Sequence, residues 1–179
     1  DRQPVQTYVV EHDLGVIVDA INREIRRGGQ VYYLHNRVET ISLAAAKLKQ
    51  RIPDCNIGIA HGKMGEEELS EVWRKLIERE IDILVCTTII ETGVDVPNAN
   101  TLIIEDADRF GLSQLHQLRG RVGRGKAKSY CILTSHNKNQ ETLLRLKALC
   151  KTTDGFKIAE EDLKLRGPGD FFGSRQSGL

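Results

Sequence analysis

The sequence lacks both of the common glycine-rich motifs that bind nucleotide phosphates. It contains no G-x-x-x-x-G-K-[ST] segment, and no G-x-G-x-x-G segment opens a helical pattern. Residues 123–129, GRGKAKS, share the composition of a phosphate-binding loop but not its spacing. Because such loops hold the phosphates in folds that bind nucleotides unaided, the chain is not expected to form a complete nucleotide site alone.

Metal-binding and disulfide patterns are missing as well. The four cysteines show no C-x-x-C pair, and the five histidines have no metal-ligand spacing. Cys86 and Cys131 lie inside apolar runs, where cysteine usually acts as a small buried hydrophobe. These features predict reduced thiols, no bound metal and a cytoplasmic setting.

The sequence also has no long apolar run and no signal-peptide pattern at its start. A membrane-spanning helix needs roughly 20 apolar residues, and no run approaches that length. The chain begins with Asp1 rather than methionine, which predicts that it is a piece of a larger protein. Its 179 residues, 40% hydrophobic and 28% charged, suit one soluble domain, or one domain with an appendage.

The charge is nearly balanced, with 26 basic and 25 acidic residues. No overall field therefore draws the chain onto nucleic acid, and any affinity for phosphate must be local. The sharpest cluster runs from Arg119 to Lys128, which includes five basic residues and no acidic one.

Short apolar runs alternate with amphipathic segments along most of the chain. Continuous apolarity predicts strands buried on both faces of a parallel sheet, and five such runs occur, at 31–34, 57–60, 83–86, 101–104 and 130–133. Apolar residues at helical spacing lie within 17–25, 38–48 and 66–79. The pattern predicts an α/β fold with an open, mostly parallel sheet and helices on both faces.

The chain contains a single tryptophan, Trp73, which lies on the apolar stripe of 66–79. This position favours a core residue over one that stacks on a base. From Thr153 onward the alternation stops. A short amphipathic piece with Ile158, Leu163 and Leu165 precedes a glycine-rich end, which predicts a hairpin or clamp whose partner lies elsewhere.

Residues 117–124, QLRGRVGR, form the centre of the basic cluster. A glycine inside a helix costs about 1 kcal/mol, so the segment favours a loop over a solvated helix face. Arginine offers a planar fork of donors that matches phosphate oxygens, and glycine permits close approach. The segment predicts a loop that presents its three arginines to a phosphate; a plain basic turn is the alternative.

Ligands of open α/β sheets bind beyond the carboxyl ends of the strands. Four loops follow predicted strands: HNR at 35–37, HGKM at 61–64, TTIIETGVDVPN at 87–98 and EDADRFG at 105–111. Asp95 is either a ribose-binding carboxylate or a turn residue. Thr87 and Thr88 either contact a nucleic-acid phosphate or satisfy the strand end. His61 and Gly62 either donate to a ligand or form a turn.

Together, and in this order, HNR, HGKM, TTIIETGVDVPN and QLRGRVGR resemble the second RecA-like lobe of superfamily 2 helicases and translocases. The resemblance implies that Arg121 and Arg124 reach the γ-phosphate held by the first lobe. It implies a nucleotide-binding role for Gly93, Asp95 and Gln117, with Asp95 on the ribose. It also implies that four residues lie near the nucleic-acid backbone, namely Asn36, His61, Gly62 and Thr88. Gln117 replaces the histidine of many RNA helicases, which argues against the DEAD-box branch.

Two segments, RFGLSQLHQLRGRVGRG (109–125) and DLKLRGPGDFFGSRQSG (162–178), resemble two families of bacterial double-stranded DNA translocases. These are the transcription-repair coupling factors, which more of the chain resembles, and the RecG-type branch-migration helicases, which the tail resembles. In both families a translocation motif follows the lobe, and its essential arginine and glutamine correspond to Arg166 and Gln176.

The resemblance implies a motor lobe at 1–152 and a translocation motif, a helical hairpin and loop, at 153–179. It implies an ATP-driven duplex-DNA translocase in transcription-coupled repair, with RecG-type remodelling of branched DNA as the alternative. ATP and Mg²⁺ would be held mainly by the missing first lobe, and RNA polymerase and excision-repair proteins would be partners through other domains. A non-enzymatic nucleic-acid-binding module and a Rossmann-type enzyme are the rival interpretations.

Overall fold

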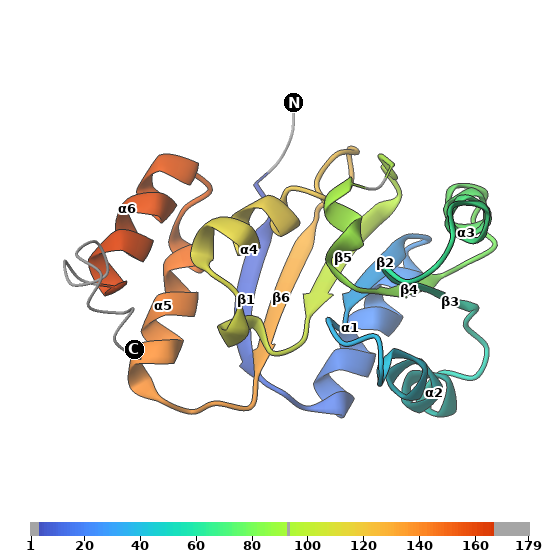
Figure 1. Ribbon diagram of the computed structural model, residues 1–179, viewed down its shortest axis with the longest axis horizontal. Helices are drawn as coiled ribbons and strands as arrows, with labels where there is room; N and C mark the ends of the chain where they lie inside the picture. The colour runs from blue at the N-terminus through green and yellow to red at the C-terminus, as the bar shows by residue number, and fades with distance from the viewer. Residues whose placement is uncertain (1–3, 93, 167–179) are drawn as a thin grey trace.

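The computed structural model describes residues 4–92 and 94–166, which form one six-stranded sheet flanked by helices (Figure 1). The strand order is β1-β6-β5-β2-β4-β3, and every pairing between neighbours is parallel. The predicted α/β class is therefore confirmed. The strands are β1 (Gln6–Glu11), β2 (Gln30–Leu34), β3 (Ile57–Ala60), β4 (Ile83–Cys86), β5 (Ala99–Ile104) and β6 (Tyr130–Ser135).

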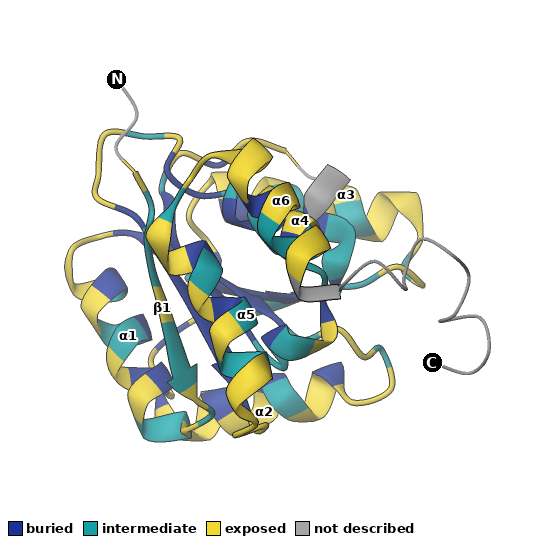
Figure 2. Ribbon diagram, turned by 90° about the vertical axis from the view of Figure 1, so that its left-hand side faces the viewer, coloured by how far each residue is buried: buried dark blue, intermediate teal, exposed yellow. Residues whose placement is uncertain are grey.

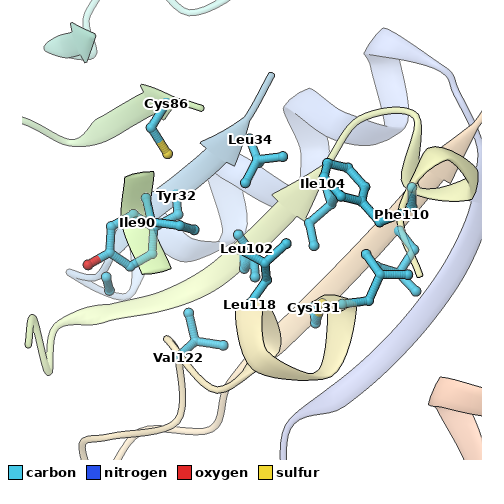
Figure 3. Close-up of a cluster of buried hydrophobic side chains, with 14 of the residues drawn as sticks. Tyr32, Leu34, Cys86, Ile90, Leu102, Ile104, Phe110, Leu118, Val122 and Cys131 are labelled. Carbon is cyan, nitrogen blue, oxygen red and sulfur yellow. The ribbon is translucent and has the colours of Figure 1, made fainter. Parts of the chain in front are cut away.

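Helices cover both faces of the sheet, and the buried side chains form two clusters. One cluster includes Ile17 and Ile21 of α1 with Ile41 and Leu48 of α2. The other contains residues of α3, α4, α5 and α6, and Figure 3 shows part of it. The helices are α1 (Leu14–Arg26), α2 (Ile41–Arg51), α3 (Glu66–Ile77), α4 (Leu112–Arg119), α5 (Gln140–Lys151) and α6 (Gly155–Arg166), with short 3₁₀ helices η1 (Thr88–Thr92) and η2 (Ala107–Arg109).

The central strands are buried as the apolar runs predict. Every residue of β2, β4 and β5 is buried, because helices pack on both sides of these strands. The same prediction was wrong for β3, where only Ala60 is fully buried. β3 is an edge strand that pairs with β4 alone, so its other side has no neighbouring strand.

The strand β1 has no counterpart among the predicted runs. Its sequence, QTYVVE, mixes polar and apolar residues, and its side chains are half-buried or exposed. Figure 2 shows this strand at the margin of the sheet, where it pairs only with β6. An edge position needs fewer apolar residues, so β1 lacks the continuous apolarity of the central strands.

The apolar stripes of the predicted helices face the sheet, with one exception in α3. Leu76 is completely buried, whereas Ile77 is 52% exposed. Trp73 is half-buried and packs against the larger core cluster, as the core interpretation predicts. Cys86 and Cys131 are buried thiols, also as predicted.

The last two helices form a hairpin that packs beside α4. Asn139 caps α5, since its side chain accepts hydrogen bonds from the backbone N–H groups of Glu141 and Thr142. The predicted amphipathic piece belongs to α6, where Ile158 is buried and Leu163 is 47% exposed. Within 4–92 and 94–166, no helix has the length and apolarity required to cross a membrane.

Candidate functional site

The arginine loop, residues 120–129, connects α4 to β6 and is anchored by a buried valine. Val122 is completely buried and points into the larger core cluster, near Leu102 and Leu118 in Figure 3. Gly123 has a φ of 80°, a left-handed conformation that glycine adopts without strain. The valine between the two glycines therefore fixes the loop, with Arg121 and Arg124 on either side of the anchor.

Only part of QLRGRVGR is a loop, which corrects the prediction. Gln117 to Arg119 form the last turn of α4, and Gly120 caps it. The Arg119 side chain is 3% exposed, so it is not presented to a phosphate. Gln117, which the family resemblance placed at the nucleotide, lies in the same turn and is exposed.

Arg119 binds groups from three other parts of the chain. Its guanidinium donates to the carbonyl oxygens of Leu149 in α5 and of Thr152, which follows α5, and to the hydroxyl of Thr7 in β1. It also lies 3.1 Å from Nδ1 of His116. Burial lowers the pKa of Arg119, because the charged form loses hydration. The hydrogen bonds to these acceptors compensate for that loss, so the residue joins α4 to the hairpin and β1.

Asp95 and Arg124 meet at the amino edge of the sheet. Arg124 Nε lies 3.7 Å from Asp95 Oδ1, and both side chains are solvent-accessible, at 37% and 55%. Gly125 permits this approach, because a Cβ at that position would lie 2.7 Å from the Pro97 carbonyl oxygen. Asp95 immediately precedes β5, so the expectation that its loop lies at the carboxyl edge was wrong for this residue, and Arg124 precedes β6 at the same amino edge.

Four other predicted site residues lie at the carboxyl edge of three neighbouring strands. Asn36 follows β2, His61 and Gly62 follow β3, and Thr88 follows β4. The Asn36 side chain accepts a hydrogen bond of 3.2 Å from the backbone N–H of Thr88. His61 Nδ1 accepts from the backbone N–H of Lys63 at 3.2 Å. A Cβ at Gly62 would lie 3.8 Å from Ile89, which places this turn against η1.

The segment after β4 spans the height of the sheet and joins the two edges. It leaves the carboxyl edge at Thr87, whose N–H donates to the Ala60 carbonyl, and reaches the amino edge before β5. Ile90 of η1 is buried in the core cluster, as Figure 3 shows. The 3₁₀ helix η1, which begins at Thr88, is thus held to the core by a buried side chain.

A half-buried carboxylate at the carboxyl edge was not singled out from the sequence. Glu105 follows β5, and its oxygens contact the Tyr33 hydroxyl and, at 2.9 Å, His35 Nδ1. Burial alone would raise the pKa of Glu105, but the hydrogen bonds from His35 and Tyr33 outweigh it and hold the pKa below its ordinary value. The negative charge therefore persists beside Asn36, where it orients the His35 ring.

Arg145 of α5 is a second residue that the sequence did not reveal. Its guanidinium donates to the carbonyl oxygens of Phe110 at 2.7 Å and of Asp108 at 2.5 Å, in the turn before α4. The only sequence signal was the helical period that turns Leu146 and Leu149 inward, and this period does not specify a partner for Arg145. The hairpin is therefore fastened to both ends of α4, by Arg145 and by Arg119.

The remaining predicted residues are described only in part. Arg166 is the last residue of α6. Gly93 and Gln176 lie outside the described residues. In 4–92 and 94–166, no three of the His, Cys, Asp and Glu side chains are grouped as metal ligands would be.

Two protein-family models match separate parts of the chain. The helicase conserved C-terminal domain family matches residues 14–126, from α1 to the arginine loop. The C-terminal part of domain 3 of the ATP-dependent DNA helicase RecG matches residues 152–179. The second match begins at the turn between α5 and α6.

Curated and solved relatives agree with these assignments. The transcription-repair-coupling factor of Staphylococcus haemolyticus is 53% identical over the whole chain, which spans 16% of that protein. RecG bound to a three-way DNA junction is 42% identical, with a TM-score of 0.81 over 94% of this chain and 23% of RecG. The Saccharomyces cerevisiae Dbp5 C-terminal domain, at 18% identity, covers 92% of this chain and all of its own, and its TM-score of 0.64 supports the fold alone.

Proposed function

The chain belongs to the family of helicase conserved C-terminal domains, and we propose that it is the second RecA-like lobe of an ATP-driven duplex-DNA translocase. Residues 1–152 form the lobe in this proposal, and residues 153–179 form the translocation motif. The observation that carries the proposal is the approach of Asp95 to Arg124 at one exposed edge. These two residues come from separate motifs and meet only because of the fold.

The Asp95–Arg124 edge has the groups that the outer half of a nucleotide site requires. A carboxylate accepts hydrogen bonds from ribose hydroxyls, and an exposed guanidinium presents parallel donors to phosphate oxygens. ATP would supply the phosphoryl group whose transfer to water drives the motor, with Mg²⁺ held by the first lobe. Arg121 and Arg124 would stabilise the charge that develops on that group, which is typically worth ~10³–10⁵ in rate.

The carboxyl edge would contact the DNA backbone through Asn36, His61, Gly62 and Thr88. Backbone N–H groups and small polar side chains are typical phosphate contacts that carry no sequence preference. The Asn36–Thr88 hydrogen bond supports a shared role for the two loops. The segment that spans the sheet would transmit nucleotide-dependent shifts of Asp95 to Thr88.

We further propose that the full-length protein is a transcription-repair coupling factor. The 53% identity to such a factor over the whole chain supports this choice over a RecG-type helicase, which is 42% identical. The larger protein would then displace stalled RNA polymerase, recruit excision-repair proteins and act in the cytoplasm on chromosomal DNA. The RecG-type match of residues 152–179 supports a translocation motif that both families share.

Alanine substitution in the full-length protein tests the role of the arginine loop. Arg121→Ala and Arg124→Ala should each reduce DNA-stimulated ATP hydrolysis by at least about 10³-fold, because each removes a donor that acts on the transferring phosphoryl group. Lys126→Ala is the matched control, since it removes an exposed charge from the same loop and should retain most of the rate. Hydrolysis that survives both arginine substitutions would reject the proposed site.

A further inference from the structure

The edge strand β3 borders an open slot of about 680 Å³. Helices α2 and α3 both contact β3, and their buried residues belong to different core clusters, so the two helices lie on opposite faces of the sheet. Figure 1 shows β3 at the margin of the sheet, between these two helices. Residues of β3, α2 and α3 all line the slot. Because it is lined from both faces, the slot opens onto the edge of the sheet.

The backbone of β3 has an unpaired side that faces this slot. Among the described residues, β3 pairs with β4 alone. The carbonyl oxygens of Asn56 and Ala60 accept hydrogen bonds from backbone N–H groups at the start of β4 and just after its end. Successive residues of a strand direct their N–H and C=O groups to opposite sides, so those of Ile57 and Ile59 point away from β4. These two residues therefore offer donors and acceptors to one further strand.

The sequence of β3 does not protect this edge. Edge strands are commonly blunted by charged residues or by proline, and IGIA contains neither. The opposite edge strand, β1, carries Gln6 and Thr7 and ends in Glu11. An extended peptide can add to an unprotected edge as a new strand, and the backbone hydrogen bonds then supply much of the affinity.

Apolar side chains line both walls of the slot. They come from Ala45 of α2, from Val72 of α3 and from Ile81, which precedes β4. The side chains of an added strand would alternate between the two walls, because successive side chains of a strand point to opposite faces. Apolar, β-branched residues of the occupant would therefore pack on both walls.

The charges of the slot favour an acidic occupant. Lys49 of α2 and Lys75 of α3 are exposed, and each lines one wall. Glu80 also lines the slot, but its carboxylate is already paired with Arg74 at 3.0 Å. A second copy of this chain, paired through its own β3, would bring two more lysines to the same place, and like charges repel. The slot therefore suits an acidic partner better than self-association.

We propose that the open edge of β3 is a docking site for an extended, acidic segment of a partner protein, which adds to the six-stranded sheet as a further strand. Backbone hydrogen bonds to Ile57 and Ile59 would hold the segment, and its apolar side chains would fill the slot. Its flanking carboxylates would pair with Lys49 and Lys75. No residue of the proposed nucleotide or DNA contacts lines the slot, so the inference goes beyond the proposed function.

Fluorescence anisotropy with the full-length protein tests the proposal. The probe is a labelled octapeptide in which four β-branched residues, matching the four residues of β3, lie between two pairs of aspartates. The control peptide has lysines in place of the aspartates. We expect saturable binding of the acidic peptide and no binding of the basic one. Absence of saturable binding, or equal binding of the two peptides, would overturn the proposal.

Ile59→Pro tests the backbone contact. Proline removes the outward N–H of residue 59 and leaves the hydrogen bonds to β4 in place. The Kd for the acidic peptide should rise about tenfold, because one peptide carbonyl loses its donor. Ile59→Val is the matched control, since it keeps the N–H, and should bind the peptide as the unmodified protein does. Equal Kd values for the two variants would contradict strand addition at β3.

Charge reversal provides variants that leave β3 itself untouched. Lys49→Glu and Lys75→Glu should each raise the Kd for the acidic peptide about fivefold, because a repulsion replaces an attraction. The double variant should gain binding of the basic peptide. Lys47→Glu, at an exposed position of α2 that does not line the slot, is the matched control and should leave the Kd unchanged. If all three single variants behave alike, the slot does not bind the peptide.

Sedimentation of the full-length protein without peptide distinguishes the alternative occupant. We expect no dimer that depends on β3. A dimer that Ile59→Pro abolishes and Ile59→Val preserves would show that the edge pairs with a second copy of the chain, and it would overturn the proposal of an acidic partner.

Discussion

Arg119 is a buried guanidinium that holds two other segments, the end of α5 and β1, to α4. Arg119→Ala should lower the free energy of unfolding by about 3 kcal/mol, because the buried carbonyl oxygen of Leu149 and the partly buried one of Thr152 would lose their donor. Urea denaturation of the chain measures this. Arg51→Ala, at an exposed position in α2, is the control and should change stability by less than about 0.5 kcal/mol. Equal effects of the two substitutions would contradict the structural role of Arg119.

The spacing of apolar residues in α4 predicts the burial of Arg119. Arg119 follows Leu115 by four positions and Leu112 by seven, and both leucines are buried. It therefore lies on the inward stripe of α4. The glycines of QLRGRVGR favour a loop, and the loop prediction wrongly included this arginine. The roles of Arg121 and Arg124 remain predictions, since side-chain chemistry alone does not identify the ligand that the loop contacts.

His116 makes the stability of the same region depend on pH. Burial, and then the charge of Arg119, lower its pKa in the folded chain below the ordinary value of 6.5. The unfolded ring therefore takes up a proton at a higher pH than the folded ring, so stability is complete above pH 6.5 and falls as the pH decreases below it. His12 shifts in the same direction, chiefly through burial.

When the pH is lowered from about 7.5 to 5.5, the melting temperature of His116→Gln should consequently fall less than that of the unmodified chain. Thermal unfolding at a series of pH values measures the difference. His61→Gln, at the opposite edge of the sheet, is the control and should keep the original dependence. Identical slopes for His116→Gln and the unmodified chain would show that the Arg119–His116 contact does not govern this behaviour.

At the scale of elements, α6 is the first helix of the proposed translocation motif, residues 153–179. Arg166 ends this helix and belongs to neither of the loops that hold Asp95 and Arg124. Arg166→Ala in the full-length protein should therefore leave DNA-stimulated ATP hydrolysis largely intact and abolish duplex translocation. A triplex-displacement assay beside a hydrolysis assay distinguishes the two activities, with Lys164→Ala as the control on the same helix. Loss of both activities would make Arg166 structural or catalytic, and loss of neither would make the tail dispensable.

The strands whose burial is complete were all predicted from the sequence. β2, β4 and β5 lie between helices on both sides, and continuous apolar runs mark each of them. β1 was not predicted, because an edge strand needs only part of its surface to be apolar. The edge position of β3 was not predictable either, since IGIA has the composition of a central strand.

At the scale of the whole molecule, the predicted site residues occupy two opposite edges of one sheet. Asp95 and Arg124 lie at the amino edge, and the Asn36–Thr88 contact lies at the carboxyl edge. The sequence placed both groups in loops but not at different edges, because the segment after β4 crosses the sheet before β5 begins. Two edges joined by one segment suit a motor lobe that binds nucleotide on one side and DNA on the other.

ATP hydrolysis by the 179-residue chain alone, compared with the full-length protein, tests the central claim most directly. In our proposal the chain supplies Arg121, Arg124 and Asp95, and because its sequence has no phosphate-binding loop the nucleotide site would require another lobe. We expect no phosphate release above background from the chain, with or without duplex DNA, and DNA-stimulated release from the full-length protein. Robust, DNA-stimulated turnover by the chain alone would contradict the claim that it is one half of a two-lobe motor.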